Sequence, residues 1–411
     1  MLALLTRLLP IFLPVAVLGV ALAGAQQPGW SEDAQLKFLT RHWKLPIAPQ
    51  GAPPARFPPL EASLQPESCG TCHPAQFADW QTSLHARSMG PGFKGQLVEM
   101  VEDDPASALH CYSCHAPLSE QQEKVDDGKG GHAANRAFDA KLQARGLACA
   151  ACHVREHQRF GPPKRDGSLA SDLPREKLPH NGVTRTPAFL RAEFCKECHQ
   201  FPPDGYALNG KLLENTYNEW KASPSGRAGV QCQECHMPDR RHLWRGIHDP
   251  EMVRSGVTVT LTTDKPRYRT GQPVNATLTI TNQKVGHYFP TYVTPRVVAR
   301  AELRDAKGRP VPGSPEERII GRQVSPDLSR ELADTRIAPG KSFVLRYRRP
   351  LNQPGLRLKV TVTVYPDHFY TGFFESLLAQ GAGKGTPQIR EALAATRRSP
   401  FVLFEKELAL N

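Results

Sequence analysis

Five copies of one short pattern, Cys-x-x-Cys-His, account for every cysteine in the chain. They read SCGTCH, HCYSCH, ACAACH, FCKECH and QCQECH. The cysteines are Cys69 and Cys72, Cys111 and Cys114, Cys149 and Cys152, Cys195 and Cys198, and Cys232 and Cys235. The histidines that follow them are His73, His115, His153, His199 and His236. Two thiols beside an imidazole could bind zinc, exchange a disulfide or hold a haem.

The repetition favours haem. A c-type haem is attached through two thioether bonds to its vinyl groups, and the two-residue gap places two sulfurs there. The histidine that comes next reaches the iron from the same side. A zinc site needs two such pairs to converge and gives no reason for a histidine after each pair. A redox dithiol needs one pair. The sequence therefore predicts five covalently bound haem c groups, attached by the ten cysteines and ligated by the five motif histidines.

Each predicted iron keeps one open axial position. Beyond Met1 the chain has only four methionines, whereas the 15 histidines less the five in the motifs leave ten. We expect mostly bis-histidine, low-spin haems with low potentials. The candidate distal ligands are His85, His180, His242, His248 and His287. Each could instead lie at the surface, bind a propionate or, for His287, cap a strand. Weaker candidates are His110, His157, His42 and His132, and His368 is expected at the surface.

The N-terminus reads MLALLTRLLPIFLPVAVLGVALAGAQQ. A basic residue, a short apolar run and a small-residue end are typical of a secretory signal peptide, which we predict for residues 1–25. An uncleaved anchor is the alternative, disfavoured by Pro10 and Pro14. No other stretch is apolar enough to span a bilayer, so we expect a periplasmic or extracellular protein without a membrane span after cleavage.

The formal net charge of +12 would usually suggest binding to nucleic acid or to an anionic membrane. Haem propionates offer another explanation, because each ferric bis-histidine haem carries roughly one net negative charge. Five haems would cancel much of the excess. We therefore expect no nucleic-acid partner, and export also argues against one.

Composition divides the chain into segments. Residues 26–66 are rich in proline and predict an extended extension. Residues 67–250 hold all five motifs and few apolar residues at helical period. We expect a pentahaem cytochrome c domain there, mainly α-helical or irregular, with short helices and loops packed around the haems.

The pattern changes after residue 255. Stretches such as GVTVTLTTD, VNATLTITN and LRLKVTVTVYP alternate apolar and polar residues, and Gly, Pro, Asn and Asp separate them. They predict an immunoglobulin-like antiparallel β-sandwich over residues 255–411. TGFFESLLAQ and PQIREALAATRR are expected to be helices, and FVLFEKELAL a closing strand. The predicted fold class is α+β, with more than one domain.

The sequence resembles a known family in its haem-proximal motifs. CGTCHPAQFADWQTSLHA, CYSCHAPLSEQ and GVQCQECHMPD resemble multihaem c-type cytochromes of the cytochrome c-five-five-four-like group, and VGHYFPT resembles the linker of members with an appended β-domain. The resemblance covers about residues 67–370. It implies an exported electron carrier with stacked haem pairs and His85 as a distal ligand, and it supports His180, His242 and His248. Related nitrite reductases often replace one motif histidine by lysine, which this chain does not.

The leading functional hypothesis is electron relay between redox partner proteins, such as other cytochromes or a quinol-linked donor. The alternative is an oxidoreductase that acts on a small nitrogen or sulfur compound at one open haem, with Arg155, His157 or Arg159 nearby. Whether the protein is an enzyme stays open, and no catalytic residue is assigned. The β-sandwich could shield the haems or dock a partner, a surface or another copy of the chain.

Overall fold

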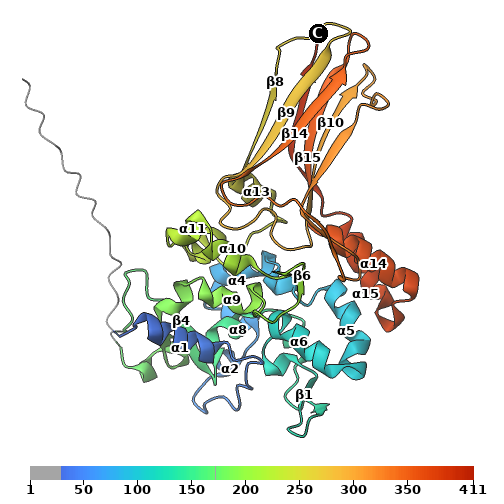
Figure 1. The fold of residues 1–411 in the computed structure, drawn as a ribbon. Helices are drawn as coiled ribbons and strands as arrows, with labels where there is room; N and C mark the ends of the chain where they lie inside the picture. The colour runs from blue at the N-terminus through green and yellow to red at the C-terminus, as the bar shows by residue number, and fades with distance from the viewer. Residues whose placement is uncertain (1–28, 172) are drawn as a thin grey trace, which may run out of the picture.

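The computed structural model describes residues 29–171 and 173–411 and combines short helices with antiparallel sheets (Figure 1). We call residues 29–256 the helical part. Its helices are α1 (Glu32–His42), α2 (Pro59–Ala62), α3 (Pro66–Gly70), α4 (Pro74–Thr82), α5 (Pro91–Asp103), α6 (Pro105–His115), α7 (Ala140–Gln143), α8 (Cys149–His153), α9 (Glu193–His199), α10 (Thr216–Lys221), α11 (Pro224–Arg227), α12 (Cys232–His236) and α13 (Pro250–Gly256). Its short strands are β1 (Lys124–Asp126), β2 (His132–Ala134), β3 (Val154–Arg155), β4 (Gln158–Gly161), β5 (Val183–Arg185), β6 (Ala207–Leu208) and β7 (Lys211–Leu212). The predicted mixture of helix and strand is confirmed.

Helix ends position the motifs. Four helices stop at a motif histidine: α6, α8, α9 and α12. Residues three and four apart lie on one face of a helix, so both cysteines and the histidine of each motif project to the same side. A helical turn thus produces the arrangement that two thioether bonds and an axial ligand need. Within the described ranges no helix is long and apolar enough to cross a membrane. The predicted signal peptide lies outside these ranges.

The proline-rich extension is not extended throughout, because α1 occupies eleven of its residues. Ser31 caps this helix by accepting a hydrogen bond from the Ala34 N–H. Phe38, Leu39 and His42 are buried on one helical face, and they pack in an apolar cluster with Trp43 and residues around α8. The spacing of these apolar residues indicates a helix. The many prolines that follow it led to the prediction of an extended segment instead.

Two antiparallel sheets form the second region, which we call the two-sheet part. One sheet has the order β14-β9-β8, with β8 (Val257–Thr263), β9 (Pro273–Asn282) and β14 (Ser342–Pro350). The other has the order β11-β10-β15-β16, with β10 (Arg296–Arg304), β11 (Glu316–Ile320), β15 (Arg357–Tyr365) and β16 (Phe401–Ala409). The predicted strands and the closing strand at FVLFEKELAL are confirmed.

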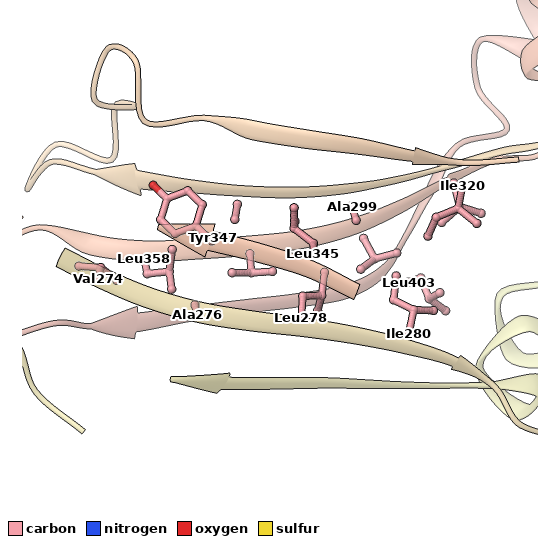
Figure 2. Close-up of a cluster of buried hydrophobic side chains, with 14 of the residues drawn as sticks. Val274, Ala276, Leu278, Ile280, Ala299, Ile320, Leu345, Tyr347, Leu358 and Leu403 are labelled. Atoms are coloured by element: carbon pink, nitrogen blue, oxygen red, sulfur yellow. The ribbon is translucent and has the colours of Figure 1, made fainter. Parts of the chain in front are cut away.

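The strands hold together through alternating burial. Every second residue of β9 and β15 is buried, as a strand with one face on a core requires. Figure 2 shows side chains of both sheets meeting in this core, among them Leu278, Ile280, Leu345 and Leu358. Burying one such side chain contributes about 1.5–3 kcal/mol, so the sheets have an apolar core of their own.

Two helices between β15 and β16 leave the sheets and return to the helical part. They are α14 (His368–Gln380) and α15 (Thr386–Thr396), and they lie beside α5 (Figure 1). Three glycines make this close approach possible. A Cβ atom on Gly92 would lie 2.6 Å from Phe374, one on Gly95 2.8 Å from Ile389, and one on Gly385 2.0 Å from the Gly95 carbonyl oxygen.

This packing gives a first prediction. Gly385→Ala should destabilise the protein by about 1–3 kcal/mol, because the new methyl group meets backbone that cannot move aside. Gly372→Ala is the matched control. Gly372 lies inside α14 with nothing within 4 Å of its Cβ position, so alanine should stabilise by about 0.4–1 kcal/mol. Thermal unfolding measures both variants, and equal effects would contradict the close contact between α5 and α15.

A buried arginine joins the two parts elsewhere. The strands β12 (Arg322–Val324) and β13 (Glu331–Asp334) form a hairpin beside β6 and β7. The Arg322 side chain is 1% exposed and donates to the carbonyl oxygens of Leu208, Lys211 and Leu212. Its charge is balanced by Glu331, whose carboxylate lies 2.8 Å away. The hairpin is thus fixed to the helical part by groups that have no access to water.

Candidate functional site

The motifs lie against one another in space. The Cys69 thiol interacts with that of Cys149, which places the first motif beside the third. Cys114 interacts with Cys198, which places the second motif beside the fourth. The fourth also touches the fifth, through Cys195 and Cys232. No disulfide joins any of the ten cysteines. The fourth motif therefore has neighbours on two sides, in the second and fifth motifs.

Three motif histidines face a second histidine. The ring centres are 6.3 Å apart for His85 and His199, 6.3 Å for His153 and His242, and 6.4 Å for His236 and His287. Two imidazoles that bind one iron through nitrogens about 2 Å from the metal have ring centres about 6.4 Å apart. The spacing fits one iron between the rings of each pair, so the residues present fit a haem.

Six histidines among the motif and candidate distal residues form hydrogen bonds through Nδ1 and leave Nε2 free. Backbone carbonyl oxygens accept from Nδ1 of six histidines, at Ser88 for His115 (2.8 Å), Phe160 for His153 (2.8 Å), Gly182 for His180 (3.3 Å), Arg245 for His236 (2.6 Å), Arg240 for His242 (3.0 Å) and Tyr288 for His287 (2.9 Å). A carbonyl can only accept, so Nδ1 carries the proton and Nε2 keeps its lone pair. A ligating histidine is normally held this way.

His199 differs in its partner. Its Nδ1 lies 2.7 Å from the hydroxyl of Tyr292. Tyr292 and His287 both belong to the connection between β9 and β10, which we call the junction segment (residues 283–295). The two-sheet part thus supplies one ring opposite the fifth motif and one hydrogen bond to the fourth. The sequence analysis missed Tyr292, although this residue immediately follows the motif VGHYFPT.

Desolvation by the surrounding protein favours the neutral rings, although these side chains are only partly buried and His199 is exposed. Desolvation lowers the pKa of His153, His199 and His287 to about 4, and that of His85 to about 3. Desolvation also lowers the pKa of His115, His180, His236 and His242. A neutral imidazole is the form that binds iron, because the metal and a proton compete for the same lone pair. The surrounding protein therefore favours the neutral imidazole, which is the form that can bind iron.

His73 and His180 remain to be placed. His180 lies near enough to His73 for charge on that ring to lower the pKa of His180, after the larger effect of desolvation. Its backbone has a φ of 41° and its N–H donates to Glu61 at 2.6 Å. A left-handed backbone is unusual for histidine, and Glu61 helps to hold it. His73 lies within electrostatic reach of His180 and also of His153 and His242.

Other histidines use the opposite nitrogen. Nε2 of His248 lies 2.9 Å from Asp367, that of His42 lies 2.9 Å from the Cys152 carbonyl oxygen, and that of His157 lies 3.0 Å from the Gly51 carbonyl oxygen. These bonds occupy the nitrogen that the ligating set keeps free. His248, expected from the sequence as a distal ligand, instead links the end of the helical part to the start of α14. Arg155 and Arg159 also donate to backbone carbonyls.

Glu214 and Tyr370 lie near the second motif. Burial raises the pKa of Glu214 to about 8, with a smaller contribution from Cys114. Tyr370 lies on α14 within electrostatic reach of Glu214 and Cys111, and its side chain is partly exposed. The His115 ring stacks on Phe93 at 3.9 Å. Among the described residues, no histidine ring faces His115 at the 6.3–6.4 Å found for the other pairs.

Comparison with known proteins agrees with this geometry. Residues 68–136 and 148–237, which contain all five motifs, match the family described as cytochrome c554 and c-prime. Cytochrome c-552 of Aliarcobacter butzleri (strain RM4018) is 27% identical over 188 residues, which is 43% of this chain and 36% of that protein. Cytochrome c-554 of Nitrosomonas europaea is 25% identical over 144 residues, which is 32% of this chain and 55% of that protein. The matches thus span about a third to a half of the relatives' own length.

A solved structure extends the likeness beyond the motifs. The penta-heme cytochrome c552 from Thermochromatium tepidum has a TM-score of 0.55 and 18% identity, over 85% of this chain and 99% of the other. At this identity the likeness concerns the fold, which includes most of the two-sheet part as well as the helical part.

Proposed function

We propose that this chain, a multihaem c-type cytochrome, is an exported pentahaem protein that relays electrons between redox partners through mostly bis-histidine haems. The observation that carries the proposal is the set of three histidine pairs whose ring centres are 6.3–6.4 Å apart. When bound, the haems supply one-electron chemistry. The protein favours the neutral form of the proposed axial rings and orients most of them through a hydrogen bond at Nδ1.

The proposed ligand sets follow from the contacts. His242 would serve the third motif, His85 the fourth and His287 the fifth, and His180 the first. We leave His248 out, since its Nε2 is bound to Asp367. The adjacent cysteines support a branched route, with the first motif next to the third and the fourth between the second and fifth. Cys152 lies within electrostatic reach of Cys195 and Cys198, which supports a step from the third motif to the fourth.

The sheet order β14-β9-β8 against β11-β10-β15-β16 supports the immunoglobulin-like assignment. We further propose that the two-sheet part completes haem pockets, because His287 and Tyr292 come from its junction segment. Docking of a redox partner and self-association through the sheets stay predictions. Export also stays a prediction, because it depends on the N-terminal residues.

Two measurements test the relay. The pyridine haemochrome assay with intact mass should give five haems per chain, and a variant with Cys69→Ser and Cys72→Ser should give four. Low-temperature electron paramagnetic resonance of the oxidised protein should show mainly low-spin ferric haem. Fewer than five haems, or several high-spin haems, would contradict the proposal.

A second function can be tested at the second motif, because no described histidine ring faces His115 at the distance found for the three histidine pairs. If the haem of the second motif keeps an open axial position, a small nitrogen or sulfur compound could bind there. The expected sign is one high-spin ferric signal that cyanide or nitric oxide converts to low spin. Steady turnover of hydroxylamine or nitrite by the pure protein would then favour an oxidoreductase over a relay alone.

A further inference from the structure

One proximal histidine has a side chain as its hydrogen-bond partner. His115, His153 and His236 donate Nδ1–H to backbone carbonyls. His199 meets the hydroxyl of Tyr292 at 2.7 Å. Every residue supplies a backbone carbonyl, so that partner does not depend on the residue type. A hydroxyl partner is present only if the residue at that position has a hydroxyl in its side chain.

The backbone conformation of Tyr292 and the contacts of its neighbour Thr291 hold the Tyr292 side chain beside His199. Its backbone φ is 59°, in the left-handed region that aromatic residues rarely adopt. The phenol ring lies nearly parallel to the His199 ring, with centres 6.5 Å apart. The neighbouring Thr291 hydroxyl bonds to Thr216 at 2.8 Å and to Glu219 at 3.1 Å. These contacts fix the junction segment on α10, so the strained backbone is maintained by its surroundings.

The hydroxyl also has acceptors behind it. Glu214 and Thr216 interact with the same phenolic oxygen. Oε2 of Glu214 is buried and has no hydrogen-bond partner among the described residues. A His199 ring that binds iron through Nε2 carries its proton on Nδ1, so the Tyr292 oxygen accepts this hydrogen bond. Glu214 lies close to the same hydroxyl as a second polar neighbour.

We propose that Tyr292 is a positioning residue that orients His199 and lowers the reduction potential of the haem on the fourth motif. An accepted Nδ1–H makes the imidazole a better electron donor, which favours ferric over ferrous iron. The fourth motif lies between the second and fifth, so this hydrogen bond would set the potential of the central haem. The inference rests on the proposed function, because it takes His199 as an iron ligand.

Tyr292→Phe in the full haem-loaded protein tests the proposal. This change keeps the aromatic ring and removes the hydroxyl. The equilibrium between ferric and ferrous iron of one haem should then shift about tenfold toward ferrous, which equals a rise of about 59 mV in its one-electron reduction potential. Redox titration followed by optical and paramagnetic resonance spectra should show one shifted haem and four unchanged ones. Glu214→Gln keeps an acceptor and should shift the same haem less.

Tyr288→Phe is the matched control. Tyr288 lies in the same segment and holds Arg336 against its ring at 5.0 Å, a contact that phenylalanine retains. The five haem reduction potentials of Tyr288→Phe should match those of the parent protein. Tyr292→Phe with five haems and unchanged potentials would overturn the inference and leave the relay intact. If Tyr292→Phe does not fold, Tyr292→Leu, which also lacks the hydroxyl, takes its place, and five haems with unchanged potentials in that variant would overturn the inference. A parent protein without haem at the fourth motif would overturn the relay itself.

Discussion

Replacing His287 by alanine should convert one low-spin haem to high spin and leave five haems attached. The thioether bonds depend on Cys232 and Cys235, which the change does not touch. The iron of the fifth motif would lose its second imidazole and keep His236. Low-temperature electron paramagnetic resonance should show a ferric high-spin signal equal to about one haem beyond the parent spectrum.

The reason lies in how His287 is placed. Its ring is within 10° of parallel to His236, with centres 6.4 Å apart. Nδ1 donates to the Tyr288 carbonyl oxygen at 2.9 Å, so Nε2 points away with its lone pair free. The junction segment is anchored at both ends by strands, which makes replacement of the lost ring by a distant side chain costly. Loss of a strong donor should also raise the potential of this haem.

His248→Ala provides the comparison. This histidine was also a candidate from the sequence, but its Nε2 is bound to Asp367. Its loss should leave the spin states of all haems as they are. If His248→Ala creates the high-spin signal and His287→Ala does not, the assignment of ligands by the free ring nitrogen is wrong. His287→Met keeps a weak ligand and should reduce the high-spin signal, which distinguishes lost ligation from a disturbed fold.

The parts of this structure that depend on local spacing could be predicted from the sequence. Cysteines three apart followed by histidine define one helical turn, and α8 and α12 consist of little else. Alternation of apolar and polar residues in VNATLTITN matches the burial of β9 from Val274 to Thr281. Both patterns depend on neighbours along the chain, so they need no knowledge of tertiary structure.

Pairing of histidines could not be predicted, because it depends on which distant segments meet. His85 lies beside the first motif in sequence and faces the fourth in space. His248 and His287 both looked suitable, and only the hydrogen bonds on their rings separate them. The role of Tyr292 could not be predicted for the same reason, since its partner His199 precedes it by 93 residues.

A buried ion pair fixes the junction segment to the helical part. Arg336 lies 2.8 Å from Glu219, with side chains only 6% and 4% exposed. Glu219 also accepts from the Tyr288 N–H at 3.2 Å and from Thr291. Arg336 further binds Asp334 and stacks on Tyr288. The carboxylate of Glu219 is thus satisfied by Arg336 together with Tyr288 and Thr291 of the junction segment.

Arg336→Met should therefore cost about 3–5 kcal/mol of unfolding free energy, because it leaves Glu219 charged and buried without its counter-ion. Denaturant unfolding followed by circular dichroism and the haem absorption band measures the loss. Arg397→Met is the control: its pair with Glu375 is about half exposed on both sides, so its loss should cost less than about 1 kcal/mol. Adding Glu219→Leu to Arg336→Met should recover part of the loss, because no charge then remains unpaired. Equal effects of Arg336→Met and Arg397→Met would mean that the junction segment is held by its apolar contacts, and the ligand His287 would then not depend on this ion pair.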